Sequence, residues 1–311
     1  MWDSLVRNDV GKELISDIKP STLKVFYSKL SKKKYAKATI KYIHELITPT
    51  FELAIDDEML SNNPAKRVKC GGYGEDPVER TALTIQQQEN LLEFIDNSKV
   101  YNVYGPMVRI QLGTGVRAGE LLGLTRDDID LDKGIIKIDH QLIYKNRGGK
   151  GTEFKIAPPK TRAGKRNIPI THEVRQAINK QYQYNMMLGI GKTYEVDGHR
   201  GFLFNSKTGR PMQLSAYNCV LKNIVNKYNA IETARAKYEH RKPDLMPRIT
   251  SHILRHTGCT RMAEQGISIK ILQYIMGHEN VAVTLQVYTH ISDPNMVATE
   301  LEKADPLKVA R

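Results

Sequence analysis

A break near residue 70 constrains the fold of this chain most. Residues Lys69–Arg80 read KCGGYGEDPVER, with three glycines and a proline among mixed charges. This composition is typical of a linker between domains. The chain has 311 residues, enough for about two domains. We therefore expect a domain at residues 1–70, a linker at 71–80 and a larger domain at 81–311, with a tail from about residue 293.

The first domain should be helical. Apolar residues recur between Ile40 and Ile55 at close to the 3.6-residue period of a helix. Pro49 should kink or interrupt that helix, because proline lacks the N–H that the helix needs. The sequence Ser61–Pro64 (SNNP) is a stop signal before the linker.

The larger domain should be mixed. Residues 134–144 and 165–170 indicate strands of one small antiparallel sheet, with a turn at 146–151. Thr84 and Gln87 form a capping-box pattern at the start of a helix. Residues 230–247 are charged with a weak apolar pattern, so we expect a mobile insertion there. Further helices are expected at 172–187, 214–228, 252–265 and 269–276. The fold class is mainly α with a small antiparallel β-sheet.

The composition excludes several classes of protein. No apolar run approaches the length of a membrane span, and no signal-peptide pattern opens the chain. The three cysteines lie far apart and form no C-x-x-C pair, which argues against a disulfide framework or a structural zinc site. His252 and His256 have zinc-helix spacing but lack the glutamate of that motif, so we expect no metal.

The net charge of +13 predicts a polyanionic partner. Residues 24–41 contain seven lysines and no acid, and residues 145–166 contain eight cations and one acid. Each cluster could be a solvated face, or the two could hold a DNA duplex between them. The cations expected to bind DNA are Lys24, Lys29, Lys32, Lys33, Lys34, Lys37, Lys41, Arg162, Lys165 and Arg166.

Five segments together resemble the tyrosine recombinases, the integrase family of enzymes that break and join DNA. They occur in the family's order: TGVRAGELLGL (114–124), PPKTRAGKRNIPI (158–170), HILRHT (252–257), MGHENVAVT (276–284) and VYTH (287–290). The lysine-rich first part, with NNPA at 62–65, resembles the family's core-binding domain. The closest likeness is to integrases of conjugative transposons and of temperate phages of Gram-positive bacteria. Such integrases usually carry a small arm-binding domain before the core-binding one, whereas this sequence starts almost inside the first expected core-binding helix.

The resemblance implies the chemistry and the residues that perform it. Tyr288 would attack a backbone phosphate, giving a 3′-phosphotyrosine and a free 5′-hydroxyl. Arg117 and Arg255 would hold the phosphate, His252 would handle a proton, and His278 would donate to the phosphate. Lys160 would protonate the leaving oxygen, with Lys165 as the alternative. We expect Glu120 to orient Arg117 and His256 to be structural.

The resemblance also implies partners and rival functions. We expect a bacterial, cytoplasmic, nucleoid-associated enzyme without cofactor that integrates and excises a mobile element. It would close like a clamp on double-stranded attachment-site or transposon-end DNA, as a dimer per site and a tetrameric synapse that exchanges C-terminal tails. An accessory excision factor is a further expected partner. The alternatives are a type IB topoisomerase-like strand swivelase and a catalytically silent DNA-binding regulator of the same fold.

Overall fold

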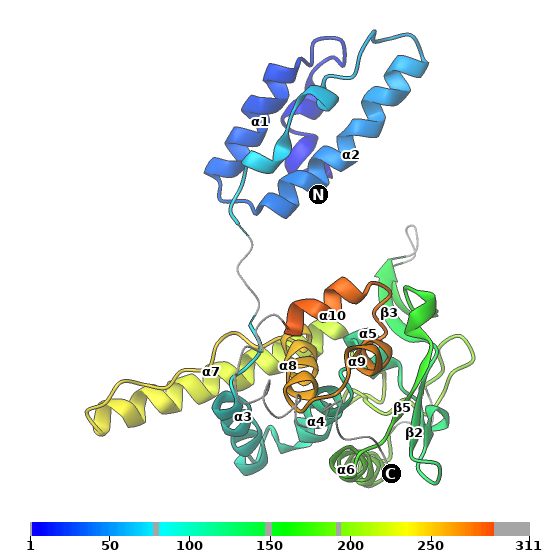
Figure 1. Ribbon diagram of the computed structural model, residues 1–311, viewed down its shortest axis with the longest axis vertical. Helices are drawn as coiled ribbons and strands as arrows, with labels where there is room; N and C mark the ends of the chain where they lie inside the picture. The colour runs from blue at the N-terminus through cyan, green and yellow to red at the C-terminus, as the bar shows by residue number, and fades with distance from the viewer. Residues whose placement is uncertain (1, 77–80, 147–150, 191–193, 289–311) are drawn as a thin grey trace, which may run out of the picture. The chain divides into compact units, whose positions relative to one another are not determined.

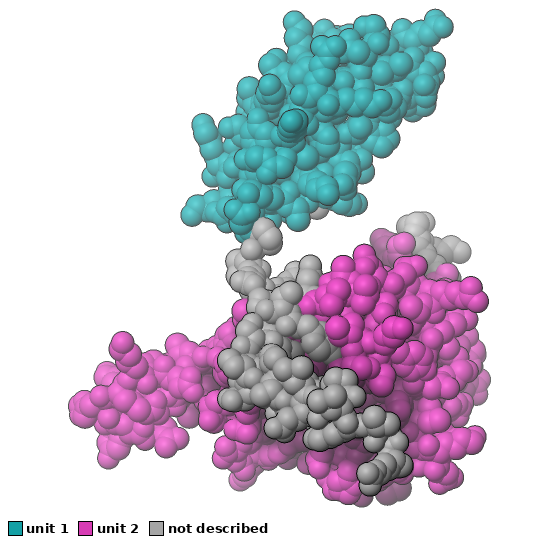
Figure 2. Space-filling model, viewed as in Figure 1, with its two compact units in different colours: residues 1–80 teal, residues 81–311 magenta. Residues whose placement is uncertain are grey.

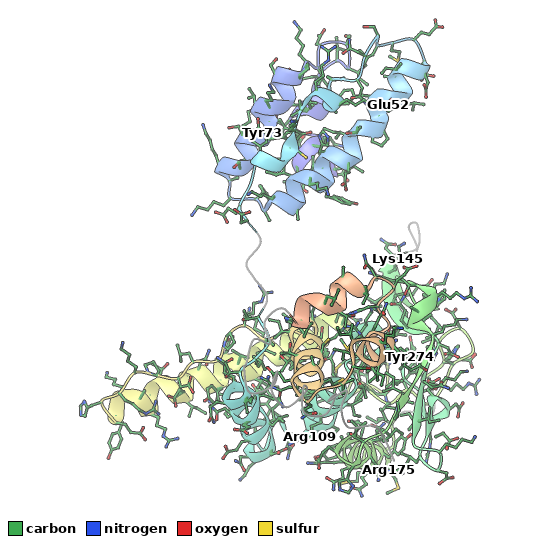
Figure 3. All side chains as sticks on the ribbon, viewed as in Figure 1. Glu52, Tyr73, Arg109, Lys145, Arg175 and Tyr274 are labelled. Carbon is green, nitrogen blue, oxygen red and sulfur yellow. The ribbon has the colours of Figure 1, made fainter. Side chains whose placement is uncertain are left out.

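The computed structural model describes residues 2–76, 81–146, 151–190 and 194–288. The chain divides into two compact units, residues 1–80 and 81–311 (Figures 1 and 2). Most of the expected linker belongs to unit 1. The Gly74 N–H donates to Ser31 Oγ at 3.0 Å, and the ring of Tyr73, which is labelled in Figure 3, lies edge-on to that of Tyr27. The prediction of a linker from residue 71 was therefore too early, because Tyr73 adds an aromatic ring to the core of unit 1.

Unit 1 is helical, as predicted, with two long helices. α2 runs through Pro49, which does not interrupt it as expected. The buried residues Ile43, Ile47 and Phe51 lie on both sides of the proline along one helix face, so packing outweighs the lost hydrogen bond. The elements of unit 1 are η1 (Trp2–Val6), η2 (Val10–Lys12), α1 (Pro20–Lys32), α2 (Lys37–Asp56), η3 (Ala65–Arg67) and η4 (Cys70–Gly72).

Unit 2 is mainly helical. The predicted capping box forms at the start of its first helix: the Gln87 N–H donates to Thr84 Oγ1 and the Thr84 N–H to Gln87 Oε1, both at 3.1 Å. Its helices are α3 (Ile85–Asn97), η5 (Asn102–Tyr104), α4 (Gly105–Thr114), α5 (Ala118–Gly123), η6 (Arg126–Asp128), η7 (Arg162–Gly164), α6 (His172–Met187), α7 (Leu214–Tyr238), α8 (Ser251–Glu264), α9 (Ile269–Met276) and α10 (Val281–Tyr288).

The strands form two small antiparallel sheets rather than the single sheet predicted. One has the order β1-β2-β5 (Ile129–Asp130, Ile135–Ile138, Arg166–Pro169), and the other pairs β3 (Gln141–Asn146) with β4 (Thr152–Ala157). The predicted segment 134–144 breaks at His140, whose ring contacts the carbonyl oxygen of Gly123 at 2.9 Å and Asp139 Oδ1 at 2.7 Å. Much of the predicted turn at 146–151 lies outside the described residues.

α7 is longer than predicted. It continues to Tyr238, and its second half extends away from the rest of unit 2 (Figure 1, yellow). The following segment returns along it: Glu232 pairs with Arg241 and accepts the Asp244 N–H at 2.9 Å. The prediction of a mobile insertion at 230–247 is therefore wrong, because an ion pair and a hydrogen bond hold the returning segment against α7.

A close helix crossing positions the candidate site. A Cβ on Gly258 of α8 would lie 2.2 Å from the Leu112 carbonyl oxygen of α4, so only glycine permits this approach. The crossing carries Arg255 of α8 to the C-terminal end of α4. None of the helices in the described part of the chain has the length and hydrophobicity of a transmembrane segment.

Candidate active site

A cleft of about 1110 Å³ in unit 2 gathers side chains from distant parts of the sequence. One wall comes from α5 and β3, another from the start of α7 and α8, and a third from the segment between α9 and α10. Each residue predicted to be catalytic whose side chain is described lines this cleft: Arg117, Lys160, His252, Arg255 and His278.

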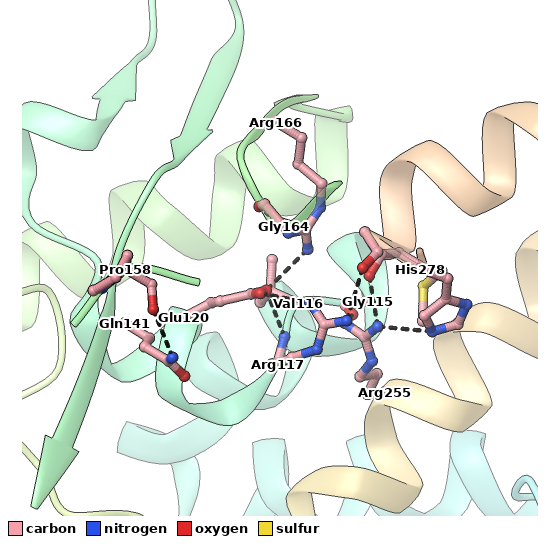
Figure 4. Close-up of polar contacts among 12 residues, drawn as sticks. Gly115, Val116, Arg117, Glu120, Gln141, Pro158, Gly164, Arg166, Arg255 and His278 are labelled. Atoms are coloured by element: carbon pink, nitrogen blue, oxygen red, sulfur yellow. Dashed lines mark hydrogen bonds and ion pairs between the residues drawn. The ribbon is translucent and has the colours of Figure 1, made fainter. Parts of the chain in front are cut away.

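Arg117 is held on two sides. It occupies the N-cap position of α5, and its Nη1 donates to Glu120 Oε1 at 2.8 Å while Nη2 donates to the Gly277 carbonyl oxygen at 2.8 Å (Figure 4). The Glu120 side chain is 1% exposed and also accepts the Arg117 N–H at 2.9 Å. Glu120 thus orients Arg117 as expected, while 28% of the Arg117 side chain remains exposed to the cleft.

Arg255 is more deeply buried. Nη1 donates to the Gly115 carbonyl oxygen and Nη2 to that of Met276, both at 2.6 Å, and Nη2 lies 2.9 Å from His278 Nε2 (Figure 4). Burial, then repulsion from Arg117, lower the pKa of Arg255 to about 9, which leaves the guanidinium charged at neutral pH. Burial, then the charges of Arg255 and Arg117, lower the pKa of His278 to about 4, so its imidazole is neutral.

Arg166 is a third guanidinium in this cluster, and its predicted DNA-binding role is wrong. Its side chain is fully buried. It donates to Glu120 Oε2 at 2.9 Å, to the Gly164 carbonyl oxygen at 2.8 Å and to the Ile275 carbonyl oxygen at 2.6 Å. The basic cluster at 145–166 predicted exposed cations, but β5 turns every second side chain inward, and Arg166 is on the inner face.

Several of the carbonyl acceptors for these arginines lie at the C-terminal ends of α4 and α9. Gly115 and Gly277 adopt left-handed conformations (φ 61° and 59°) as the C-caps of α4 and α9. The last carbonyl groups of a helix have no partner within the helix and carry its partial negative charge. A Cβ on Gly277 would lie 2.9 Å from Arg166 Nη1, so a side chain there would displace the guanidinium.

Lys160 and His252 are exposed and face the cleft. Lys160 lies on the connection between β4 and β5, and His252 precedes Arg255 by one turn of α8. Lys165 is also exposed but does not line the cleft. Tyr288 is the last residue of α10, and the segment just before α10 forms one wall of the cleft. The Tyr288 side chain and the predicted tail lie outside the described residues.

Comparison with known proteins decides the family. The model of the Phage integrase family matches residues 81–294, more than half of the chain. The chain belongs to the phage integrase family. This integrase is a tyrosine recombinase, an enzyme that cleaves and rejoins DNA in the recombination of mobile elements.

The similar proteins include a transposase and integrases of mobile elements. The integrase is 35% identical to the transposase from transposon Tn916 of Enterococcus faecalis over 96% of this chain and 69% of the relative. It is 28% identical to the integrase of Staphylococcus phage L54a, over 84% of this chain and 67% of the relative. The Tn1549 transposon integrase in complex with transposon right end DNA has 32% identity and a TM-score of 0.79, with 96% of this chain and 89% of that chain covered.

Seven of the lysines predicted to bind DNA lie in unit 1 of the integrase, and all but the half-buried Lys37 are exposed. Three of them have acidic partners: Lys29 with Asp9 at 3.2 Å, Lys37 with Asp76 at 2.7 Å and Lys41 with Glu45 at 3.7 Å. The others, Lys24, Lys32, Lys33 and Lys34, are exposed and have no ion pair with a described residue, as is also true of Arg162 and Lys165 in unit 2.

One group of residues in the integrase has metal-ligand types: Asp128, Asp139 and His140. Their atoms are already engaged. Asp128 Oδ2 accepts from the N–H and the hydroxyl of Thr125, at 2.8 and 2.6 Å. His140 Nδ1 lies 2.7 Å from Asp139 Oδ1 and Nε2 lies 2.9 Å from the Gly123 carbonyl oxygen, while Asp139 Oδ2 pairs with Lys137 at 2.6 Å. Contacts within the protein thus account for this group of residues.

The sequence analysis did not identify two polar residues of the site. Gln141 lines the cleft and donates to the Pro158 carbonyl oxygen at 2.9 Å, and no sequence pattern marks it. Thr284 is fully buried with its Oγ1 3.0 Å from His278 Nδ1. Its position one helical turn before Tyr288 could have marked it as a residue near the site.

Replacing Glu120 should destabilise unit 2. Glu120→Gln would leave the buried guanidinium of Arg166 without its counter-charge, at a cost of about 3 kcal/mol or more in the free energy of unfolding. Burial alone would raise the pKa of Glu120, but the hydrogen bonds and charges of Arg166 and Arg117 hold it below the ordinary value. Its stabilisation is therefore present above the unfolded-state pKa and is lost as pH falls through the folded-state pKa. Urea unfolding at neutral and acid pH measures both effects.

Glu239 provides a matched control, since it also pairs with two arginines, Arg235 and Arg241, but at the surface. Glu239→Gln should cost much less, because solvent screens exposed ion pairs. Equal losses for the two variants at pH 7 would contradict the assigned importance of Glu120.

Proposed function

We propose that the cleft binds the scissile phosphate of a DNA strand and that Tyr288 attacks it, giving a 3′-phosphotyrosine and a free 5′-hydroxyl. The carrying observation is that Arg117, Lys160, His252, Arg255 and His278 line one cleft. The segment that joins this cleft wall to α10 leads directly to Tyr288. The covalent bond to Tyr288 conserves the energy of the broken phosphodiester, so rejoining needs no external energy.

The chemistry is limited by charge. A phosphodiester is already anionic, and negative charge accumulates on its nonbridging oxygens in the pentavalent transition state. Fixed donors stabilise that charge without reorganising during the reaction. Arg117 and Arg255 are suitable because each guanidinium is a planar fork of donors whose position is set by protein acceptors. Loss of one such donor typically costs about 10²- to 10³-fold in rate.

The remaining cleft residues handle protons. His252 would accept the proton of the Tyr288 hydroxyl, and Lys160 would give a proton to the departing 5′-oxygen. His278 accepts from Arg255 in the DNA-free protein, so it supports this arginine first. To donate to a phosphate oxygen, its Nε2 has to gain a proton, and the negative charge of the phosphate favours that gain.

The substrate we propose is the end DNA of a mobile element and its circular form, which the integrase would integrate and excise. The support is the 32% identity to the Tn1549 transposon integrase, whose structures hold transposon right end DNA and circular intermediate DNA. Lys24 and Lys32–Lys34 would bind backbone phosphates. We further propose a dimer on each site, a tetrameric synapse with exchanged C-terminal tails, and an excision factor.

Tyr288→Phe should bind DNA within a few-fold of the wild-type affinity yet form no covalent adduct, because only the hydroxyl is lost. The measurement is adduct formation on nicked attachment-site DNA, resolved on denaturing gels, with affinity measured in parallel. Adducts formed by the Phe variant would identify another nucleophile. Joining of two separate duplexes by the wild-type protein would distinguish recombination from strand swivelling.

Lys160→Ala should be rescued by a better leaving group. The variant should cleave ordinary DNA about 10²-fold more slowly, or worse, and recover most of that loss on a bridging 5′-phosphorothiolate. The sulfur leaves as a thiolate, whose conjugate acid has a low pKa, so it needs no general acid. Single-turnover cleavage of both substrates measures the rescue.

Three further variants are the controls for this experiment. Arg117→Ala and Arg255→Ala should not recover on the sulfur substrate, because the charge they stabilise is on the nonbridging oxygens of either substrate. Lys165→Ala should cleave both substrates almost normally, since Lys165 does not line the cleft. Sulfur rescue of Lys165→Ala alone would move the general acid to that lysine.

A further inference from the structure

Thr284 is a buried hydroxyl that no step above uses. It lies in α10, is fully buried, and its Oγ1 is 3.0 Å from His278 Nδ1. The surrounding residues Val281–Val283 and Leu285 are exposed. The buried side chains described in α10 are Thr284 and Val287, and Val287 belongs to an apolar cluster with residues of α8 and α9. Thr284 therefore connects α10 to the cleft through a hydrogen bond with His278.

The direction of the hydrogen bond follows from Arg255. A guanidinium can only donate, so His278 Nε2, 2.9 Å from Arg255 Nη2, must accept with its lone pair. In a neutral imidazole the proton is then on Nδ1, which faces Thr284 Oγ1. Thr284 Oγ1 accepts a hydrogen bond from the Nδ1–H and so stabilises the tautomer that the contact with Arg255 requires.

We propose that Thr284 is a positioning residue for DNA cleavage, which acts through His278 on Arg255 and ties the helix that carries Tyr288 to the arginine cluster. The chain of contacts is Thr284 Oγ1 to His278 Nδ1, then His278 Nε2 to Arg255 Nη2. Thr284 precedes Tyr288 by four residues, about one helical turn. One hydroxyl thus couples the phosphate-binding arginine to the backbone of the nucleophile. The inference rests on the proposed roles of Arg255 and Tyr288.

Two substitutions separate the hydroxyl from the shape of the side chain. Thr284→Val keeps the branched, buried shape and removes the acceptor, whereas Thr284→Ser keeps the hydroxyl and removes the methyl group. We expect Thr284→Val to lower the single-turnover cleavage rate at saturating protein by about 10-fold or more, the equivalent of one lost hydrogen bond. DNA affinity should be unchanged, and Thr284→Ser should cleave at a rate close to that of the wild type.

A second measurement tests the route through His278. In a His278→Ala background, Thr284→Val should lower the rate no further, because the contact it removes is already absent. An equal loss in both backgrounds would overturn the proposal. A Thr284→Ser variant as slow as Thr284→Val would also overturn it, because the methyl group would then be responsible. A Thr284→Val variant as fast as the wild type would do the same.

The imidazole can be observed without DNA. The ¹⁵N spectrum of the wild-type protein should show His278 protonated at Nδ1 and unprotonated at Nε2, with the signal assigned by its loss in His278→Ala. Thr284→Val should shift the Nδ1 signal, because the Nδ1–H loses its acceptor, and identical ring signals in the two proteins would overturn the proposal. Failure of the wild type to form any covalent adduct would instead refute the proposed function, while the ring signals still test the role of Thr284.

Discussion

Three consecutive carbonyl groups at the end of α9 each accept a hydrogen bond from a different arginine. Ile275 accepts from Arg166, Met276 from Arg255 and Gly277 from Arg117. The C-terminal end of a helix supplies both the free acceptors and the partial negative charge that guanidinium groups favour. The left-handed cap at Gly277 directs the last of these carbonyls to Arg117. The rest of the candidate active site depends on this arrangement.

Three positive charges this close together repel one another, and the protein offsets the repulsion before any DNA arrives. Glu120 lies between Arg117 and Arg166, and the end of α4 adds the Gly115 carbonyl for Arg255. The acceptors restrict how the guanidinium groups can turn, so little reorganisation remains to be done when a phosphate binds. The Arg166 side chain is buried and serves as a second partner of Glu120. Arg117 keeps the partial exposure that contact with a phosphate requires.

Local patterns predicted the parts of the fold that local interactions determine. The Thr84 capping box and helix α6 at 172–187 are encoded within a few residues, and the structure has both. The burial of Arg166 could not be predicted, because its acceptors come from α5 and α9, which are distant in sequence. The length of α7 had the same cause: Asn229 and Glu232 gain their partners only when the segment near Met246 returns along the helix. The predicted site residues came from motif resemblance, which gives positions but not hydrogen-bond direction at His278.

Solvent exchange at the guanidinium groups of the DNA-free protein tests the central claim most directly. NMR can measure hydrogen exchange and rotation about the Cζ–Nη bonds of Arg117 and Arg255, with each signal assigned by an Arg→Lys variant. The account predicts slow exchange and hindered rotation without DNA, most strongly at Arg255, whose Nη atoms donate to the Gly115 and Met276 carbonyls. Guanidinium groups that rotate freely and exchange rapidly until DNA is added would contradict it, because the site would then be assembled by its substrate.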